Sequence, residues 1–297
     1  MAELDIIDAH HHLTDLSRSY PWLEGPPKPR YHGNDLPLRR SYLLDDYLAD
    51  MGRYRLLGSV HIENGAADPL LEAKWVDGVS RERGLPSVQV GKVSLLDPNA
   101  RQQLERLSQI NTMRGIRDIL NWHENPIYSH RDRGNIMTDP TWLTNFSLLA
   151  ALELSFDLQV FPSQLRAASE LAAKHPETSI ILDHAGMPIG RDEDSLAEWR
   201  TGMRLLASHP NVVTKISALG TNDHQWTTES ISPFVLETID IFGPSRTMFG
   251  SNFPVDSLYS SFATLYEAFD HLTADFSSDD RRNLFVSTAA RSYRIKL

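Results

Sequence analysis

Short apolar segments alternate with amphipathic segments along the whole chain, and this alternation is the feature that most limits its fold. The apolar runs show little polar alternation, which is typical of strands buried on both faces of a parallel sheet. Eight such β/α units in 297 residues indicate an α/β protein of the (β/α)8 TIM-type barrel class. The expected strands are 5–12, 56–63, 87–96, 114–120, 155–161, 179–184, 212–218 and 247–251.

Amphipathic patterns predict helices between these strands, at 43–53, 69–83, 100–109, 141–151, 163–174, 194–207 and 231–241. Two more, 258–272 and 279–293, follow the eighth strand. An open doubly wound sheet is the alternative, but no G-x-G-x-x-G follows the first strand. We therefore predict a single barrel domain over 1–297, with a lid-like loop rich in Pro and Gly at about 17–40.

Charge and composition exclude several classes of function. The formal net charge is −10 and no basic run exceeds Arg39-Arg40, which argues against a nucleic-acid partner. The chain has no cysteine, so thiolate chemistry and disulfides are excluded. No stretch approaches 18 apolar residues and no signal peptide is evident, so we expect a cytoplasmic protein with no membrane partner. A small molecule is the expected partner, and a homo-oligomer is compatible with the sequence.

The first expected strand ends in His10-His11-His12. Side chains alternate along a strand, so His10 and His12 point to one face, about 7 Å apart. Such a pair is able to share a metal ion or to clamp a polar substrate. A tag remnant is a poor explanation, since tags are longer, but a structural histidine remains an alternative for each ring.

Other polar side chains stand at the ends of the remaining strands, where a barrel carries its chemistry. They are His61 and Glu63 on strand two, Arg117 on strand four with Asn121 and His123 after it, Gln159 on strand five, Asp183 and His184 on strand six, Lys215 and Ser217 on strand seven, and Asn252 and Asp256 after strand eight. Several have structural alternatives. His61 fits a core histidine equally well, and Lys215 fits an ion pair with a carboxylate. Asp183 alternates with His184, so we expect it to face outward and to cap the next segment. Trp22 is either a loop anchor or an aromatic wall over the pocket.

Taken together, these motifs resemble the lactonase branch of the amidohydrolase superfamily, which includes L-fuconolactonase and 2-pyrone-4,6-dicarboxylate lactonase. The matching segments are Asp8-Ala9-His10-His11-His12, Tyr20-Pro21-Trp22-Leu23, Gly115-Ile116-Arg117, Leu182-Asp183-His184-Ala185-Gly186 and Phe249-Gly250-Ser251-Asn252-Phe253-Pro254. They occur in matching order and span nearly the whole chain. The resemblance implies a distorted (β/α)8 barrel that hydrolyses a cyclic ester.

The resemblance also implies roles for single residues. The histidines of strands one and six map onto His10, His12 and His184, which would polarise the carbonyl or hold a divalent metal such as zinc. The strand-four arginine maps onto Arg117, which would anchor the substrate. We expect Trp22, His61, His123 and Gln159 to complete the binding site.

Two departures from the family pattern matter. The strand-eight aspartate of the family falls at Asn252, and a neutral amide cannot take a proton from water. Asp256, four residues later, is the proposed replacement, with His61 as a second candidate for the base. The pyrone-dicarboxylate enzymes also carry an arginine after strand seven, whereas residues 217–222 contain none. A sugar-type lactone is therefore favoured over a dicarboxylate.

Three functions remain open at this point. The first is lactone hydrolysis, either with a divalent ion or without one, because losing the aspartate weakens the expected metal site. The second is decarboxylation, since the decarboxylase branch of the superfamily shares the strand-one and strand-six histidines. The third is a degenerate barrel that binds a small ligand without turning it over.

Overall fold

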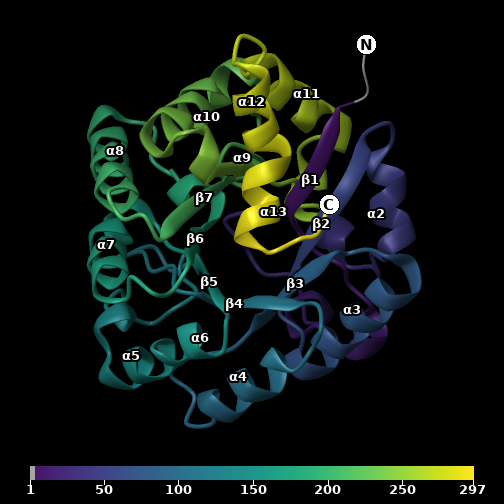
Figure 1. Cartoon of the computed structure of the whole chain (residues 1–297), viewed down its shortest axis with the longest axis vertical. Coiled ribbons are helices and arrows are strands. Elements are labelled where there is room, and N and C mark those ends of the chain that lie inside the picture. Colours follow the sequence, from purple (N-terminus) through teal and green to yellow (C-terminus); the bar gives the residue numbers. More distant parts are fainter. Residues whose placement is uncertain (1–3) are drawn as a thin grey trace.

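The computed structural model describes residues 4–297, and within them eight parallel strands form one sheet in sequence order. The sheet curls into a nearly closed barrel (Figure 1). This confirms the (β/α)8 barrel predicted from the alternating pattern. The strands are β1 Asp5–His11, β2 Arg55–Ile62, β3 Val88–Lys92, β4 Met113–Ile119, β5 Ser155–Gln159, β6 Ile180–Leu182, β7 Val212–Ile216 and β8 Thr247–Phe249.

Helices surround the strands in Figure 1. They are α1 Pro21–Glu24, α2 Leu44–Met51, α3 Pro69–Arg83, α4 Ala100–Ser108, α5 Pro140–Phe146, α6 Leu148–Ala151, α7 Leu165–Lys174, α8 Glu193–Ala207, α9 Leu219–Asn222, α10 Thr228–Phe242, α11 Phe262–Leu272, α12 Ser278–Arg282 and α13 Thr288–Ser292. None of them, in the described part of the chain, is long and apolar enough to cross a membrane. After α13, Arg294 donates hydrogen bonds to the carbonyls of Arg114 and Glu153, so the C-terminal segment covers the end at which the strands begin.

The barrel closes between the end of β1 and the segment that follows β8. The Asn252 N–H donates to the His10 carbonyl and the His12 N–H donates to the Phe253 carbonyl, both at 2.7 Å. Gly250 permits this close approach, because a Cβ there would lie 2.7 Å from the His10 Cβ. Closure therefore places Asn252 directly beside the strand-one histidines.

Several element boundaries differ from the sequence prediction. Strand β3 ends at Lys92, whereas the apolar pattern predicted a strand to residue 96. The pattern continues because Val93 and Leu95 are buried, but these two residues lie in a loop. The helix expected at 258–272 begins at Phe262. The helix expected at 279–293 is divided into α12, a π-helical turn at Asn283–Ser287, and α13. Burial alone does not distinguish a strand from a buried loop.

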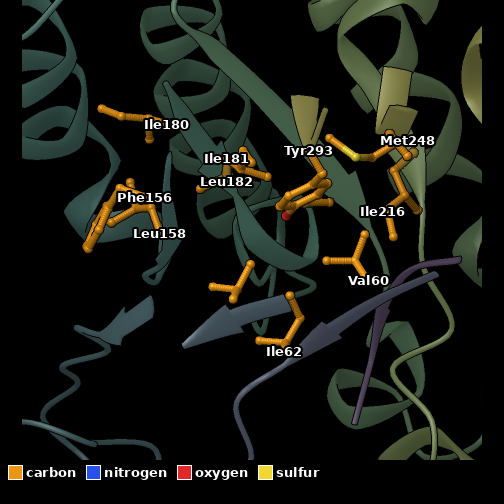
Figure 2. Close-up of a cluster of buried hydrophobic side chains, with 14 of the residues drawn as sticks. Val60, Ile62, Phe156, Leu158, Ile180, Ile181, Leu182, Ile216, Met248 and Tyr293 are labelled. Atoms are coloured by element: carbon orange, nitrogen blue, oxygen red, sulfur yellow. The ribbon is translucent and has the colours of Figure 1, made fainter. Parts of the chain in front are cut away.

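The core lies inside the barrel and between the strands and the helices. Figure 2 shows apolar side chains from β2, β5, β6, β7 and β8 gathered with Tyr293 of the C-terminal segment. Those labelled are fully buried: Val60, Ile62, Phe156, Leu158, Ile180, Ile181, Leu182, Ile216, Met248 and Tyr293. Burial of an apolar side chain of this size stabilises the fold by about 1.5–3 kcal/mol. The strand ends above this core are thus held on a rigid frame.

Candidate active site

A cavity of about 570 Å³ opens at the end of the barrel where the strands finish. Chemistry in (β/α)8 barrels sits at this end, because loops from all eight strands converge there. Of the side chains singled out in the sequence, seven line the cavity: His12, Trp22, Glu63, Arg117, Gln159, His184 and Asn252.

His12 faces the cavity. Its Nδ1 lies 2.8 Å from the Ile62 carbonyl, which only accepts, so Nδ1 carries the ring proton. The Nε2 lone pair therefore points toward Asn252, whose side-chain oxygen is placed 3.3 Å away. Two acceptors do not bond, so the amide presents its NH2 group here. Burial, helped by Arg117, lowers the pKa of His12 to about 4, which keeps the ring neutral near pH 7.

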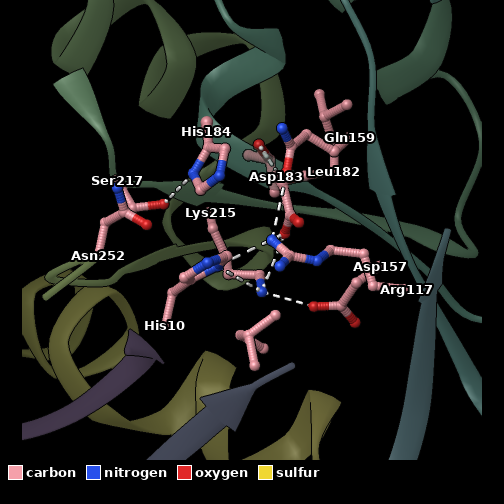
Figure 3. A network of polar contacts seen from close by, with 12 residues as sticks. His10, Arg117, Asp157, Gln159, Leu182, Asp183, His184, Lys215, Ser217 and Asn252 are labelled. Carbon is pink, nitrogen blue, oxygen red and sulfur yellow. Dashed lines mark hydrogen bonds and ion pairs between the residues drawn. The ribbon is translucent and has the colours of Figure 1, made fainter. Parts of the chain in front are cut away.

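His10 lies beneath the cavity and does not line it. Its ring centroid is 5.0 Å from that of His12 and 4.7 Å from that of His184. Its Nδ1 lies 3.2 Å from the Lys215 Nζ. Burial first, and then the charge of Lys215, lower the pKa of His10 well below its usual value. His10 is thus a buried neutral ring beside a fixed positive charge (Figure 3).

Asp183 faces inward, which corrects the expectation that it would face outward and cap the next segment. Its carboxylate is fully buried and lies 2.9 Å from the Lys215 Nζ. The reason is that β6 ends at Leu182, and His184 and Ala185 take left-handed backbone angles, with φ of 58° and 51°. Strand alternation therefore stops at Leu182 and does not predict the faces of the residues that follow.

Lys215 has the ion pair that the sequence left open. Its Nζ lies 2.6 Å from Asp157 Oδ2 as well as 2.9 Å from Asp183 Oδ1. The Tyr293 hydroxyl also donates to Asp157 Oδ2, at 2.7 Å. Figure 3 shows Asp157 of β5, Asp183 after β6 and Lys215 of β7 gathered beside His10. The cluster was not visible in the sequence, because its members lie far apart along the chain.

One group of side chains has the spacing of a metal site. Among residues 4–297, His10, Asp183 and His184 are the group of three whose ligand atoms all lie within 4.8 Å of one another. His184 is oriented by a 2.8 Å contact between its Nδ1 and the Ser217 hydroxyl. His12, which the sequence assigned to a metal together with His10 and His184, lies beside this group rather than in it.

Arg117 is held on the cavity floor by contacts with Glu63 and Gln159. Its Nε donates to Glu63 Oε1 at 2.8 Å and its Nη2 to the Glu63 carbonyl at 2.7 Å. Its Nη1 donates to Gln159 Oε1 at 3.2 Å. The nearby guanidinium holds the pKa of Glu63 below its usual value in spite of burial. Nη2 also lies 2.7 Å from Glu63 Oε1, so these contacts leave one N–H of the guanidinium, on Nη1, available to an oxygen in the cavity.

Asp256 lies behind Asn252 and does not line the cavity. It is 1% exposed, and burial raises its pKa to about 8, with Asn252 and the Ala218 backbone opposing the rise only in part. Asp256 lies within the turn Val255–Leu258, and within the described residues its carboxyl oxygens make no hydrogen bond that caps this turn. Its carboxyl group is therefore mostly protonated at pH 7, and only above about pH 8 is it mostly a carboxylate.

The loop expected to act as a lid forms one wall of the cavity. Trp22, Arg30, Tyr31 and His32 all line it. The Trp22 indole N–H donates to the Asn64 carbonyl at 2.7 Å, so this side chain is both a loop anchor and an aromatic wall. The Tyr259 hydroxyl donates to the His32 carbonyl and fastens the loop to the segment after β8. Movement of this loop as a lid stays a prediction.

Two predicted residues are not brought to this cavity. His61 is 1% exposed and its Nδ1 accepts a hydrogen bond from the Leu13 N–H at 3.1 Å, as a structural histidine does. His123 lines a separate hollow with Tyr128 and Phe161. The chain turns away from the barrel after β4, so strand periodicity gives no guide to the position of His123.

Comparison with known proteins agrees with this geometry. The model of the Amidohydrolase family matches residues 7–295. The chain is 39% identical to protein y4mH of Sinorhizobium fredii, covering 99% of this chain and 100% of that protein. It is 29% identical to an L-fucono-1,5-lactonase of Burkholderia multivorans, covering 97% and 96% of the two chains. A crystal structure of a Burkholderia multivorans amidohydrolase with bound zinc is 26% identical, covers 98% and 99% of the two chains, and superposes with a TM-score of 0.81.

Proposed function

The chain belongs to the amidohydrolase family, and from that premise we propose that it hydrolyses lactones, with a sugar-type lactone as the substrate. The observation that carries the proposal is the floor of the cavity. There the neutral His12 and the buried Arg117 guanidinium face one volume, so a proton acceptor and a cationic donor stand together. The similarity to an L-fucono-1,5-lactonase supports the same reaction.

The lining of the cavity favours a sugar-type substrate. Trp22 and Tyr31 give the cavity an aromatic wall, which suits the apolar face of a sugar ring. Gln159 and Asn252 place amide groups on the floor, which suit hydroxyl groups. Residues 217–222 contain no arginine for a second carboxylate.

In the proposed reaction, water adds to the lactone carbonyl carbon and the ring C–O bond breaks. His12 Nε2 takes the proton from the attacking water and returns it to the leaving alkoxide oxygen, so the product is a hydroxy acid. The remaining Nη1–H group of Arg117 holds the carbonyl oxygen while negative charge develops on it. Asp256 is an alternative acceptor of the proton, acting only where its carboxyl group is ionised.

A divalent ion fits the residues beneath the cavity. His10, Asp183 and His184 offer two imidazoles and a carboxylate, a donor set that zinc accepts. The His10 Nε2 is buried and has no hydrogen-bond partner among residues 4–297. When bound, such an ion would supply polarisation of the lactone carbonyl.

A panel of sugar, aromatic and aliphatic lactones, followed with a pH indicator, tests the proposal. Each assay is run after chelation and after addition of Zn²⁺ or Mn²⁺. We expect turnover of sugar lactones and a loss of at least ~100-fold in kcat for His12→Ala, the scale of a lost general base. The matched control is His175→Ala, because His175 lies at the end of α7 and outside the cavity.

Three outcomes would overturn the proposal. The first is no turnover of any lactone under any metal condition. The second is release of carbon dioxide from an aromatic acid, which would indicate a decarboxylase. The third is saturable binding of a lactone without turnover, which would indicate a ligand-binding barrel.

A further inference from the structure

The Lys215 ammonium lies against the group of three side chains that has the spacing of a metal site, His10, Asp183 and His184. The Lys215 Nζ lies 2.9 Å from Asp183 Oδ1 and 3.2 Å from His10 Nδ1, so it contacts two of the three candidate ligands. All of these side chains are buried, so water does not screen the ammonium from a second cation. An ion bound here would share both ligands with Lys215 (Figure 3).

The contact with Lys215 also determines which His10 nitrogen carries the proton. A lysine ammonium has three donors and no acceptor, so His10 Nδ1 accepts and the ring proton lies on Nε2. A metal ion needs a lone pair on the nitrogen it binds. Binding at Nε2 would move the proton to Nδ1 and point it at the ammonium, whereas Nδ1 itself is occupied by the lysine. Both nitrogens of His10 are therefore poor ligands while Lys215 is in place.

We propose that Lys215 is an internal competitor of the metal ion, a positioning residue that weakens divalent-ion binding at His10, Asp183 and His184. Asp157 takes part by holding the ammonium in position, at 2.6 Å from its Oδ2. The proposal concerns ion affinity and does not depend on which substrate the enzyme takes.

The test is the affinity for Zn²⁺ of the purified full chain, measured by calorimetry without a His tag. The decisive variant is Lys215→Met with Asp157→Asn. It removes one positive and one negative charge, so the formal charge of the cluster is unchanged, and Asp183 loses its lysine partner and becomes available to an ion. The Tyr293 hydroxyl keeps an acceptor, because the asparagine side chain still has an oxygen. We expect the double variant to bind Zn²⁺ at least tenfold more tightly than the wild type.

Two further variants separate the competitor from simple charge. Asp157→Asn alone leaves Lys215 in contact with Asp183 and lowers the negative charge, so we expect weaker binding than in the wild type. Lys92→Met removes a lysine that lines the cavity but has no ion pair within residues 4–297, and we expect an affinity within about twofold of the wild type.

A second measurement needs no variant. The ¹⁵N chemical shifts of the His10 ring report which nitrogen is protonated, and we expect the Nε2–H form in the metal-free protein. An unchanged or weaker Zn²⁺ affinity in the double variant would overturn the proposal, as would an Nδ1–H ring in the wild type. Lactone turnover is a separate readout, so failure here leaves the proposed function standing, and failure of lactone turnover leaves this result standing.

Discussion

Asp256→Asn should make the protein more stable at pH 8 while changing the pH dependence of its stability. Asp256 is 1% exposed, and burial raises its pKa from 3.8 to about 8. The folded state therefore binds this proton more tightly than the unfolded state does, and stability falls as the pH rises from about 4 to about 8. Each pH unit in that window corresponds to 1.36 kcal/mol for one group.

The size of the effect follows from that window. Over the three pH units from 5 to 8, the wild type loses at most about 4 kcal/mol at this site. Asparagine has nearly the same shape and does not ionise, so the variant avoids this loss. We expect the advantage of Asp256→Asn to grow by at least ~1 kcal/mol between pH 5 and pH 8, since relaxation reduces the full value.

Urea unfolding at pH 5, 6, 7 and 8 measures this difference directly. Asp240→Asn is the matched control, because it removes one carboxylate from the exposed face of α10. We expect no pH-dependent gain from the control. A constant difference across the four pH values, or a variant that is less stable at pH 8, would refute the reasoning.

The same variant separates two candidates for the base. If Asp256 takes the proton from water, kcat falls at least ~100-fold in Asp256→Asn, and the wild-type kcat/KM rises through about pH 8. If His12 takes it, kcat is nearly unchanged in this variant, and kcat/KM has its acid limb near pH 4.

Three other substitutions have clear expected outcomes. Arg117→Met should cost about 3–5 kcal/mol in urea unfolding, because it leaves the Glu63 carboxylate buried without its partner, and adding Glu63→Gln should recover at least half of that loss. Because the pKa of Glu63 is held below 4.5, the ion pair stabilises the fold above about pH 4.5, and this stabilisation should disappear as the pH falls through the folded-state pKa. Asn252→Asp places an anionic oxygen near His12 Nε2, so calorimetry should show Zn²⁺ binding at least tenfold tighter than in the wild type; equal affinity would argue against metal binding at this position. Trp22→Ala removes part of the aromatic wall, so KM for a sugar lactone should rise several-fold with kcat little changed, and an unchanged KM would place the substrate away from this wall.

The barrel could be predicted from the sequence because its signal is local. Each strand is a short apolar run, and the runs alternate with amphipathic helices in the order that a parallel barrel requires. The boundaries were less certain for a physical reason. Val93 and Leu95 are as buried as strand residues, although they lie in a loop over the barrel. Hydrophobicity indicates which residues are buried. It does not indicate whether a buried segment is a strand or a loop.

The candidate site shows the same division between local and distant information. His10 lies in β1 and His12 directly follows it, so their spacing alone placed the two rings close together. The sequence prediction placed Asp183 on the wrong face, because the expected strand ran to residue 184 whereas β6 ends at Leu182. The backbone of His184 has a positive φ, which a residue other than glycine rarely adopts and which no pattern in the sequence announced.

The ion pairs of Lys215 could not be predicted, because they depend on the order of the strands around the barrel. Asp157 lies in β5, Asp183 follows β6 and Lys215 lies in β7, so neighbouring strands bring together residues that are 26 and 32 positions from one another in the chain. An isolated buried lysine is unfavourable, whereas a lysine shared between two carboxylates is compatible with burial. In the sequence, Lys215 was therefore left open, Asp183 was expected to face outward and Asp157 was not singled out, and only the barrel brings the three together in one charged cluster beside His10. If our proposal holds, the affinity of this chain for a metal ion depends on residues of β5 and β7 as much as on its histidines.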